Sequence, residues 1–405
     1  MASTLAPPSP PRHGSRTPTL QSPPGAATPP AGPAPRVAPT TPIPTLDTPP
    51  SPRRTRDPFI DLVRAAATVS VITVHWLMPQ VAWDGSTLSI GNSLSTGPGW
   101  LVTWLLQVLP LLFFAAGAAA GLERSRPLTD TVRRRLPRLL LPVLALAGTW
   151  VAAAVLLPLL GVPATAVERV IRIVPQPLWF LGVYLALMVL TPLLRGLVDR
   201  VGWRAPAALA ALPVAVDLLR FTEVAPELAW LNLLAVWAVP YTIGLAYARL
   251  GEPRLGAWTW WVSSAVALVI LIGLVAAGPY PISMIGMPGD AISNLGPPTL
   301  AALAHGVLLT SLVLALRAPL TRLAAGPAAR AVAWVSARSM TLYLWHLTAM
   351  FTVVGVALLG LGLEIPAAWT PGWLAQWPLW CAAAAGVLTV LVRVYHRFET
   401  GPMRR

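Results

Sequence analysis

Two side chains that could do chemistry lie in the first strongly apolar segment of the chain, RAAATVSVITVH. Arg64 and His75 stand eleven residues apart in it. An α-helix turns about 100° per residue, so both side chains share one helix face, roughly 16 Å apart along the axis. Ionisable groups inside a membrane span are costly and usually line functional cavities. The pair therefore predicts a site where an arginine holds an anionic ligand and an imidazole exchanges a proton.

A plainer interpretation of the same pair stays open. A histidine can belong to a packed core, and an arginine near a helix end can extend its head to lipid headgroups. His346, in the segment ARSMTLYLWHLTAM, presents the same choice, because it could orient His75, line the same cavity or only pack. His75, Arg64 and His346 are the catalytic candidates.

The densest basic cluster lies in the segment LERSRPLTDTVRRRLPRLLLP. Guanidinium groups bind phosphates through two parallel hydrogen bonds, so this cluster suits a phosphorylated cytosolic ligand such as coenzyme A. Anchoring to lipid headgroups is the alternative. The predicted binding residues are Arg133, Arg134, Arg135 and Arg138.

The elements that must position these residues are membrane-spanning helices. The chain has 405 residues, of which 55% are hydrophobic and 11% charged. Runs of about 20 apolar residues recur, whereas a β-barrel would alternate apolar and polar positions. We expect an all-α polytopic membrane protein with about ten spans, near 60–80, 98–121, 136–160, 177–195, 205–221, 228–248, 257–277, 298–316, 336–360 and 375–395.

The distribution of charge predicts the topology. All 29 basic residues are arginines, and they flank the apolar runs as the positive-inside rule requires. With both termini in the cytoplasm, only Arg169, Arg172 and Arg220 lie outside. The net charge of +14 is thereby explained without nucleic acid. We expect a multi-pass protein of the cell membrane. The amino-acid composition, with many Ala, Pro, Gly and Arg residues, suggests a GC-rich genome and hence a bacterial inner membrane.

Several classes of site are excluded by composition. Without lysine there is no Walker-type phosphate loop and no Schiff-base lysine. Cys381 is the only cysteine, so neither an internal disulfide nor a cysteine-rich metal site is expected. Residues 1–56 are rich in proline and predict a disordered cytoplasmic tail. Residues 57–405 form the predicted membrane domain.

Six short motifs stand in an order known from one family. They are Arg64 with His75, FFAAG at 113–117, Arg135 with Arg138, WFLGVYL at 179–185, SMTLYLWH at 339–346 and FETGP at 398–402. From Asp57 onward the chain resembles the membrane-bound acyltransferases often called acyltransferase 3. The Pro-rich tail is not part of that pattern, and no extracytoplasmic serine-hydrolase domain is expected after the last span.

The resemblance implies transfer of an acyl group, usually acetyl, from acyl-CoA to a hydroxyl of a carbohydrate or similar acceptor. It implies an essential histidine at His75 and arginines that serve the CoA side. Acyl-CoA would be a co-substrate, with no tightly bound cofactor and no metal. His75 would act as general base, or would carry the acyl group covalently. The alternative function is a transporter or flippase for a sugar-lipid or a small solute.

Overall fold

The protein is described by a computed structural model that covers residues 57–123, 127–253 and 256–400. The tail predicted to be disordered, residues 1–56, lies outside the described residues. Its disorder and the division into two domains therefore stay predictions.

Helices make up most of the described chain. Their bounds are α1 Pro58–Leu77, α2 Gly99–Leu106, α3 Leu109–Leu122, α4 Leu128–Leu159, α5 Ala164–Ile173, α6 Leu178–Val201, α7 Ala205–Phe221, α8 Asn232–Leu250, α9 Ala257–Ala277, α10 Leu300–Ala315, α11 Arg317–Ala325, α12 Ala329–Ser336, α13 Ser339–Gly355 and α14 Pro371–Thr400. One antiparallel hairpin joins α1 to α2, formed by β1 Pro79–Trp83 and β2 Leu88–Asn92.

The all-α multi-pass architecture is confirmed. Within the described ranges, eight helices are long and apolar enough to cross a membrane, or nine if the bent pair α10–α11 counts as one span. That count takes Ala164–Phe221 as one helix, although the sequence predicts separate spans for α6 and α7. The number ten and the cytoplasmic position of both termini stay predictions.

The apolar helices differ in how much protein surrounds them. In the most apolar stretch of Pro226–Leu250, 72% of the residues are buried, against 11% for α4 and 17% for α14. A helix that is apolar on an unburied face needs an apolar surrounding, which in this protein is lipid. The interior is therefore built around α8, α13, α3 and α1, and α4 and α14 lie at the periphery.

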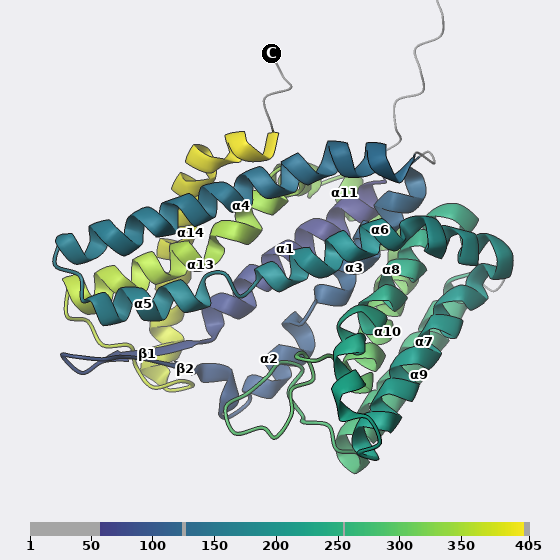
Figure 1. The fold of residues 1–405 in the computed structure, drawn as a ribbon, viewed down its shortest axis with the longest axis horizontal. Helices are drawn as coiled ribbons and strands as arrows, with labels where there is room; N and C mark the ends of the chain where they lie inside the picture. The colour runs from purple at the N-terminus through teal and green to yellow at the C-terminus, as the bar shows by residue number, and fades with distance from the viewer. Residues whose placement is uncertain (1–56, 124–126, 254–255, 401–405) are drawn as a thin grey trace, which may run out of the picture. The chain divides into compact units, whose positions relative to one another are not determined.

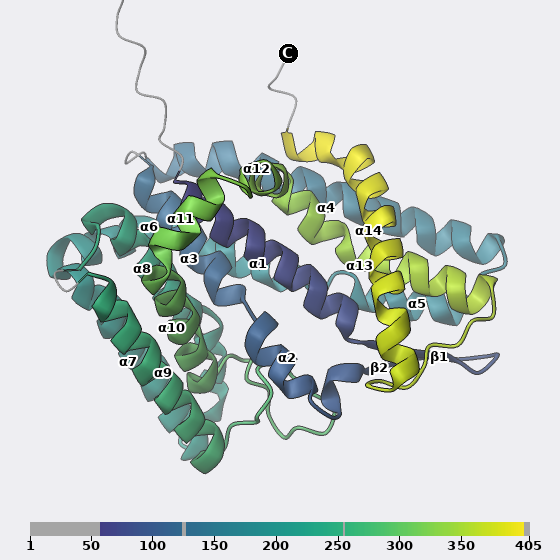
Figure 2. The same ribbon diagram turned by 180° about the vertical axis from the view of Figure 1, so that it is seen from behind.

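The central helix of the arrangement is α1. It contacts α3, α11, α12 and α13, and both ribbon views show it between the group α7 to α10 and the group α4, α13 and α14 (Figures 1 and 2). We call the end where α1 begins the inner end, since the charge pattern predicts it to be cytoplasmic. The opposite end is the outer end.

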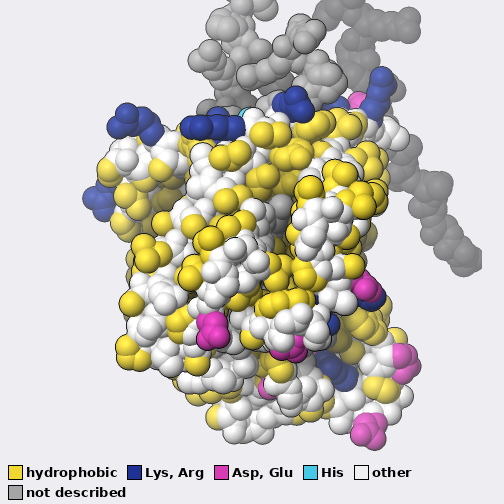
Figure 3. Space-filling model, turned by 90° about the vertical axis from the view of Figure 1, so that its left-hand side faces the viewer, with side chains coloured by type: hydrophobic (Ala, Val, Ile, Leu, Met, Phe, Trp, Pro, Cys, Tyr) yellow, Lys and Arg dark blue, Asp and Glu magenta, His cyan; other side chains and the backbone are white. Residues whose placement is uncertain are grey.

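Charge is segregated on the face of the molecule that Figure 3 shows. Figure 3 shows arginine side chains gathered along one edge, a broad apolar band beneath them, and most carboxylates toward the other end of that face. Such an uneven distribution is the pattern that the positive-inside rule describes for membrane proteins.

Helices α3 and α8 approach each other closely because glycine stands at both points of contact. A Cβ atom on Gly117 would lie 1.9 Å from the carbonyl oxygen of Tyr241, and one on Gly244 would lie 2.0 Å from that of Phe114. No side chain fits in so little space, so the backbones pack directly, as small residues allow in membranes. The FFAAG segment, which ends at Gly117, therefore serves helix packing.

The span predicted at 98–121 is interrupted. Helix α2 ends before Gln107, and α3 begins at Leu109 with Pro110 in its first turn, where proline costs no hydrogen bond. Backbone that leaves the helical conformation at membrane depth is tolerated where it lines a cavity. Gln107 and Leu109 do line one.

A β-hairpin, which the sequence does not predict, begins at the end of the span predicted at 60–80 and lies before the one predicted at 98–121. Its strands pair from Pro79 opposite Asn92 to Trp83 opposite Leu88. Asp84 closes the turn, because its Oδ1 accepts hydrogen bonds from the backbone of Thr87 at 2.7 Å and Ser86 at 2.9 Å. These hydrogen bonds lower the pKa of the Asp84 carboxyl, and the one from the backbone of Thr87 contributes most.

Candidate functional site

One face of α1 borders two cavities in succession. Arg64 and Thr68 line the first, and Val71, Val74 and His75 line the second. Positions three or four apart on a helix are neighbours on its surface. Arg64 and His75 thus lie on one helix face, but they line different cavities where the sequence predicts a single one.

The second cavity, which we call the outer cavity, has a volume of about 500 Å³. Its walls come from α1, the break before α3, α5, the start of α6, α13 and two loops at the outer end. Most of the lining is apolar. Its charged and strongly polar side chains are His75, Gln107, Arg169, Arg172, Gln176 and Tyr343.

His346 of α13 lies against His75. The two ring centroids are 4.8 Å apart, and the rings meet edge to face at 67°. His346 is fully buried, and its backbone carbonyl accepts a hydrogen bond from the indole of Trp76 at 3.0 Å. The structure therefore brings two of the three catalytic candidates together and places Arg64 in the other cavity.

Hydrogen bonds determine which nitrogen of each ring carries hydrogen. Nδ1 of His75 lies 2.7 Å from the carbonyl oxygen of Val71, and Nδ1 of His346 lies 2.5 Å from that of Tyr343. A carbonyl oxygen only accepts, so Nδ1 donates in each neutral ring and Nε2 keeps its lone pair. Nε2 of His346 is buried without a hydrogen-bond partner among the described residues. Each ring thus retains a basic nitrogen.

The first cavity, which we call the inner cavity, has a volume of about 340 Å³. Arg64 and Arg135 supply its positive charge, and Tyr184 and Ser339 add hydroxyl groups. Arg64 forms a long ion pair with Asp61, at 3.5 Å. Two guanidinium groups on one small cavity make it suitable for an anion.

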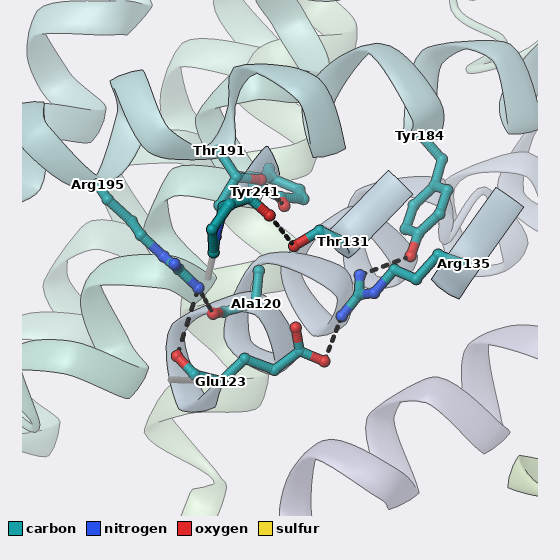
Figure 4. Close-up of polar contacts among 9 residues, drawn as sticks. Ala120, Glu123, Thr131, Arg135, Tyr184, Thr191, Arg195 and Tyr241 are labelled. Carbon is teal, nitrogen blue, oxygen red and sulfur yellow. Dashed lines mark hydrogen bonds and ion pairs between the residues drawn. The ribbon is translucent and has the colours of Figure 1, made fainter. Parts of the chain in front are cut away.

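Two partners from other elements hold Arg135 in place. Its guanidinium donates to the carboxylate of Glu123 at 2.5 Å and to the hydroxyl of Tyr184 at 3.1 Å (Figure 4). The guanidinium group has five N–H donors, so donors remain for a ligand. Arg135 is therefore a fixed cation at the wall of the inner cavity.

Arg195 of α6 is a supporting residue that is not among the predicted site residues. It donates to the carbonyl oxygens of Ala120 and Glu123, at the end of α3 (Figure 4). It thereby fixes the segment that carries the carboxylate partner of Arg135. A signal exists in the sequence, since Arg195 is a charged residue inside the apolar segment LTPLLRG.

The other three predicted binding residues lie away from the lining of the inner cavity. Arg133, Arg134 and Arg138 are exposed on α4 and are not among the described residues that line the inner cavity. Of the four predicted binding residues, the structure thus brings Arg135 alone to the inner cavity, together with Arg64.

Tyr343 separates the two cavities and lines both of them. Its hydroxyl donates to the carbonyl oxygen of Pro177 at 2.6 Å, and its ring packs 5.4 Å from that of Phe180. The same tyrosine provides the carbonyl that holds Nδ1 of His346. One residue of the SMTLYLWH segment is thus common to the inner cavity, the outer cavity and the histidine pair.

Helix α13 begins without a capping side chain of its own, and α14 supplies one. The carboxylate of Glu399 accepts hydrogen bonds from the backbone N–H groups of Met340 at 3.2 Å and Thr341 at 3.1 Å. The first N–H groups of a helix lack partners and carry partial positive charge, so a carboxylate there is stabilising. Glu399, from the FETGP segment, therefore fixes the helix that carries Tyr343 and His346.

Comparison with known protein families gives a match. A family model described as an acyltransferase domain matches residues 57–396, which include both cavities and the histidine pair. No curated protein and no solved structure matches the chain. Among the described residues, no group of three His, Cys, Asp or Glu side chains could hold a metal ion.

Proposed function

Because the chain belongs to the acyltransferase family that this match identifies, we propose that it transfers an acetyl group from acetyl-CoA to a hydroxyl of a carbohydrate acceptor. The observation that carries the proposal is the contact between His75 and His346, whose ring centroids lie 4.8 Å apart, in a cavity that shares the lining residue Tyr343 with an arginine-lined cavity. The membrane would be the cell membrane, which in a bacterium is the inner membrane.

The donor would bind at the inner end. Arg64 and Arg135 would hold a phosphate within the inner cavity, since guanidinium groups form charge-assisted bonds with phosphate oxygens. Arg133, Arg134 and Arg138 are exposed and would reach phosphates that extend beyond the cavity. A polyanion with several phosphates, such as a coenzyme A thioester, suits this distribution of charge.

The thioester would then pass Tyr343. Because the Tyr343 hydroxyl is bonded to the carbonyl oxygen of Pro177, the ring must release this bond before the narrow arm of the donor can reach the outer cavity. A net hydrogen bond contributes only about 0.5–1.5 kcal/mol, so binding of the donor can offset its loss.

The chemistry would take place at His75. Nε2 removes the proton of the acceptor hydroxyl, and the oxygen attacks the carbonyl carbon of the thioester. The C–S bond breaks, and the sulfur of CoA leaves with the proton from His75. Imidazole suits both steps because it exchanges protons near neutral pH. The unpartnered Nε2 of His346 would accept a hydrogen bond from the protonated His75 ring. On the same geometry, His75 could instead carry the acetyl group between the two steps.

The test uses the full chain purified in detergent and acetyl-CoA labelled in the acetyl group. We expect CoA release that depends on a sugar acceptor, with the label recovered as an ester of that sugar. Rapid acid quenching would show label on the protein only for the covalent route. Uptake of solute into vesicles without any CoA release would overturn the proposal in favour of transport.

A further inference from the structure

The outer cavity contains positive charge that the proposed chemistry does not use. Among the described residues that line it, the charged side chains besides His75 are Arg169 and Arg172, and no carboxylate joins them. Both arginines belong to α5. The lining therefore presents an excess of positive charge to any molecule in the same cavity as the catalytic histidine.

These arginines are exceptions to the charge pattern of the chain. Of 29 arginines, only Arg169, Arg172 and Arg220 fall on the side that the positive-inside rule predicts to be outside. Headgroup anchoring of the kind expected for the basic loops at the inner end does not explain them, because it concerns the cytoplasmic face. A separate reason for positive charge at the outer cavity is needed.

Helix α5 is oriented so that the arginines face the cavity. Its Ala166 and Val167 are buried and line a neighbouring apolar cavity, whereas Arg169 and Arg172 line the outer one. Residues three apart on a helix are neighbours, so the two guanidinium groups form one local patch of charge.

The positive charge is only partly balanced. Arg172 pairs with Glu168 at 2.5 Å, with both side chains mostly exposed, and such exposed pairs contribute little free energy. Arg169 has no ion-pair partner within the described part of the chain. Its guanidinium can therefore bind an incoming anion without first breaking a salt bridge.

We infer that the acceptor is anionic and carries a carboxylate or a phosphate, which Arg169 and Arg172 bind while the acceptor hydroxyl lies at His75. The inference rests on the proposed function, because it concerns the acceptor of the same transfer. Guanidinium groups recognise both anions through paired hydrogen bonds. The neutral amides of Gln107 and Gln176, which line the same cavity, can bind further hydroxyl groups of a sugar.

The test measures binding of three radiolabelled sugars to the purified full chain by equilibrium dialysis at low ionic strength. Methyl β-glucuronide and methyl β-glucoside differ in one carboxylate, and glucose 1-phosphate provides the phosphate. We expect at least one anionic sugar to bind about tenfold more tightly than the neutral glucoside, as one charge-assisted contact would produce. The preferred anion shows which of the two chemical classes the acceptor belongs to.

Arginine variants show whether Arg169 produces the preference for anionic sugars. Arg169→Gln should abolish the preference, and Arg169→Lys should retain part of it. Arg220→Gln is the matched control, because it removes the same charge on the same predicted side from a residue that does not line the outer cavity. Equal binding of all three sugars by the unaltered protein, or equal losses in Arg169→Gln and Arg220→Gln, would overturn the inference.

Failure of this inference can be told apart from failure of the proposed function. CoA release from acetyl-CoA is measured on the same preparations. Preference for the anionic sugar without CoA release would contradict the proposed function and leave the anion site standing. CoA release without any preference among the sugars would contradict the anion site alone.

Discussion

The inner and outer cavities differ in how their ionisable side chains are held. At the inner cavity Arg135 is fixed between Glu123 and Tyr184. At the outer cavity His75 and His346 each use one nitrogen for a backbone carbonyl and keep the other. A fixed cation suits a ligand whose charge stays constant, whereas a free basic nitrogen suits proton transfer. Under the proposed function, binding of the donor and the chemistry would therefore be divided between two cavities, both of which Tyr343 lines.

Loss of the base should have the largest effect on transfer. In His75→Gln we expect the rate of acetyl transfer to fall by about 10²–10⁴-fold, which is the contribution of general acid–base catalysis. Affinity for CoA should stay unchanged, because the inner cavity is intact. Initial rates with labelled acetyl-CoA and equilibrium dialysis with labelled CoA give the two quantities.

His305→Gln is the matched control for that variant. His305 is also buried in a helix, α10, but its Nε2 is bonded to the carbonyl oxygen of Trp104 at 2.7 Å, and it is not among the described residues lining either cavity. Glutamine can keep that hydrogen bond, so this variant should retain transfer. Similar losses in both variants would show that the histidine pair has no special role.

A change in the inner cavity should affect binding of the donor. Arg135→Gln removes a fixed guanidinium, so we expect the KM for acetyl-CoA to rise about 10–100-fold, as for a lost hydrogen bond to a charged group. The kcat should change much less. Arg200→Gln, an exposed arginine at the end of α6, is the control. A loss in kcat with an unchanged KM would contradict the division between the cavities.

Loss of the hydrogen bond that holds Tyr343 between the two cavities should have the smallest effect on the rate of CoA release. Tyr343→Phe removes the hydrogen bond to Pro177 but keeps the ring, so the two cavities should connect more often. We expect acceptor-independent CoA release to increase about two- to tenfold, corresponding to one net hydrogen bond. Tyr395→Phe loses a bond to Thr149 away from both cavities, and it should leave this rate unaltered. Equal rates of acceptor-independent CoA release in Tyr343→Phe and in the control would show that Tyr343 does not limit passage between the cavities.

Much of the fold follows from the sequence. Apolar length and arginine distribution predict the membrane helices, and helical periodicity places Arg64 and His75 on one face of α1. These features depend on local composition and spacing. The contact of His75 with His346 joins residues that are 271 positions apart in number, so periodicity alone could not predict it.

The remaining features depend on packing between helices. The interruption at Gln107, the separation of the cavities by Tyr343 and the bond from Arg195 to the end of α3 need the tertiary structure. Glu399 shows what sequence patterns cannot predict. Its carboxylate lies near the end of the sequence and caps a helix that begins 60 residues earlier. The sequence motif marks such a residue, but it does not indicate what the residue contacts.

Under the proposed function, the acetyl group passes from a donor bound at the inner end to an acceptor at the outer end. Sealed proteoliposomes containing labelled acetyl-CoA, with an acceptor that supports transfer in detergent supplied only outside, test this directly. Only protein molecules whose inner end faces the lumen can then react, so molecules inserted in the opposite orientation do not affect the result. We expect labelled acceptor outside the vesicles and none outside vesicles that contain His75→Gln. Transfer only when donor and acceptor share one side of the membrane would contradict it.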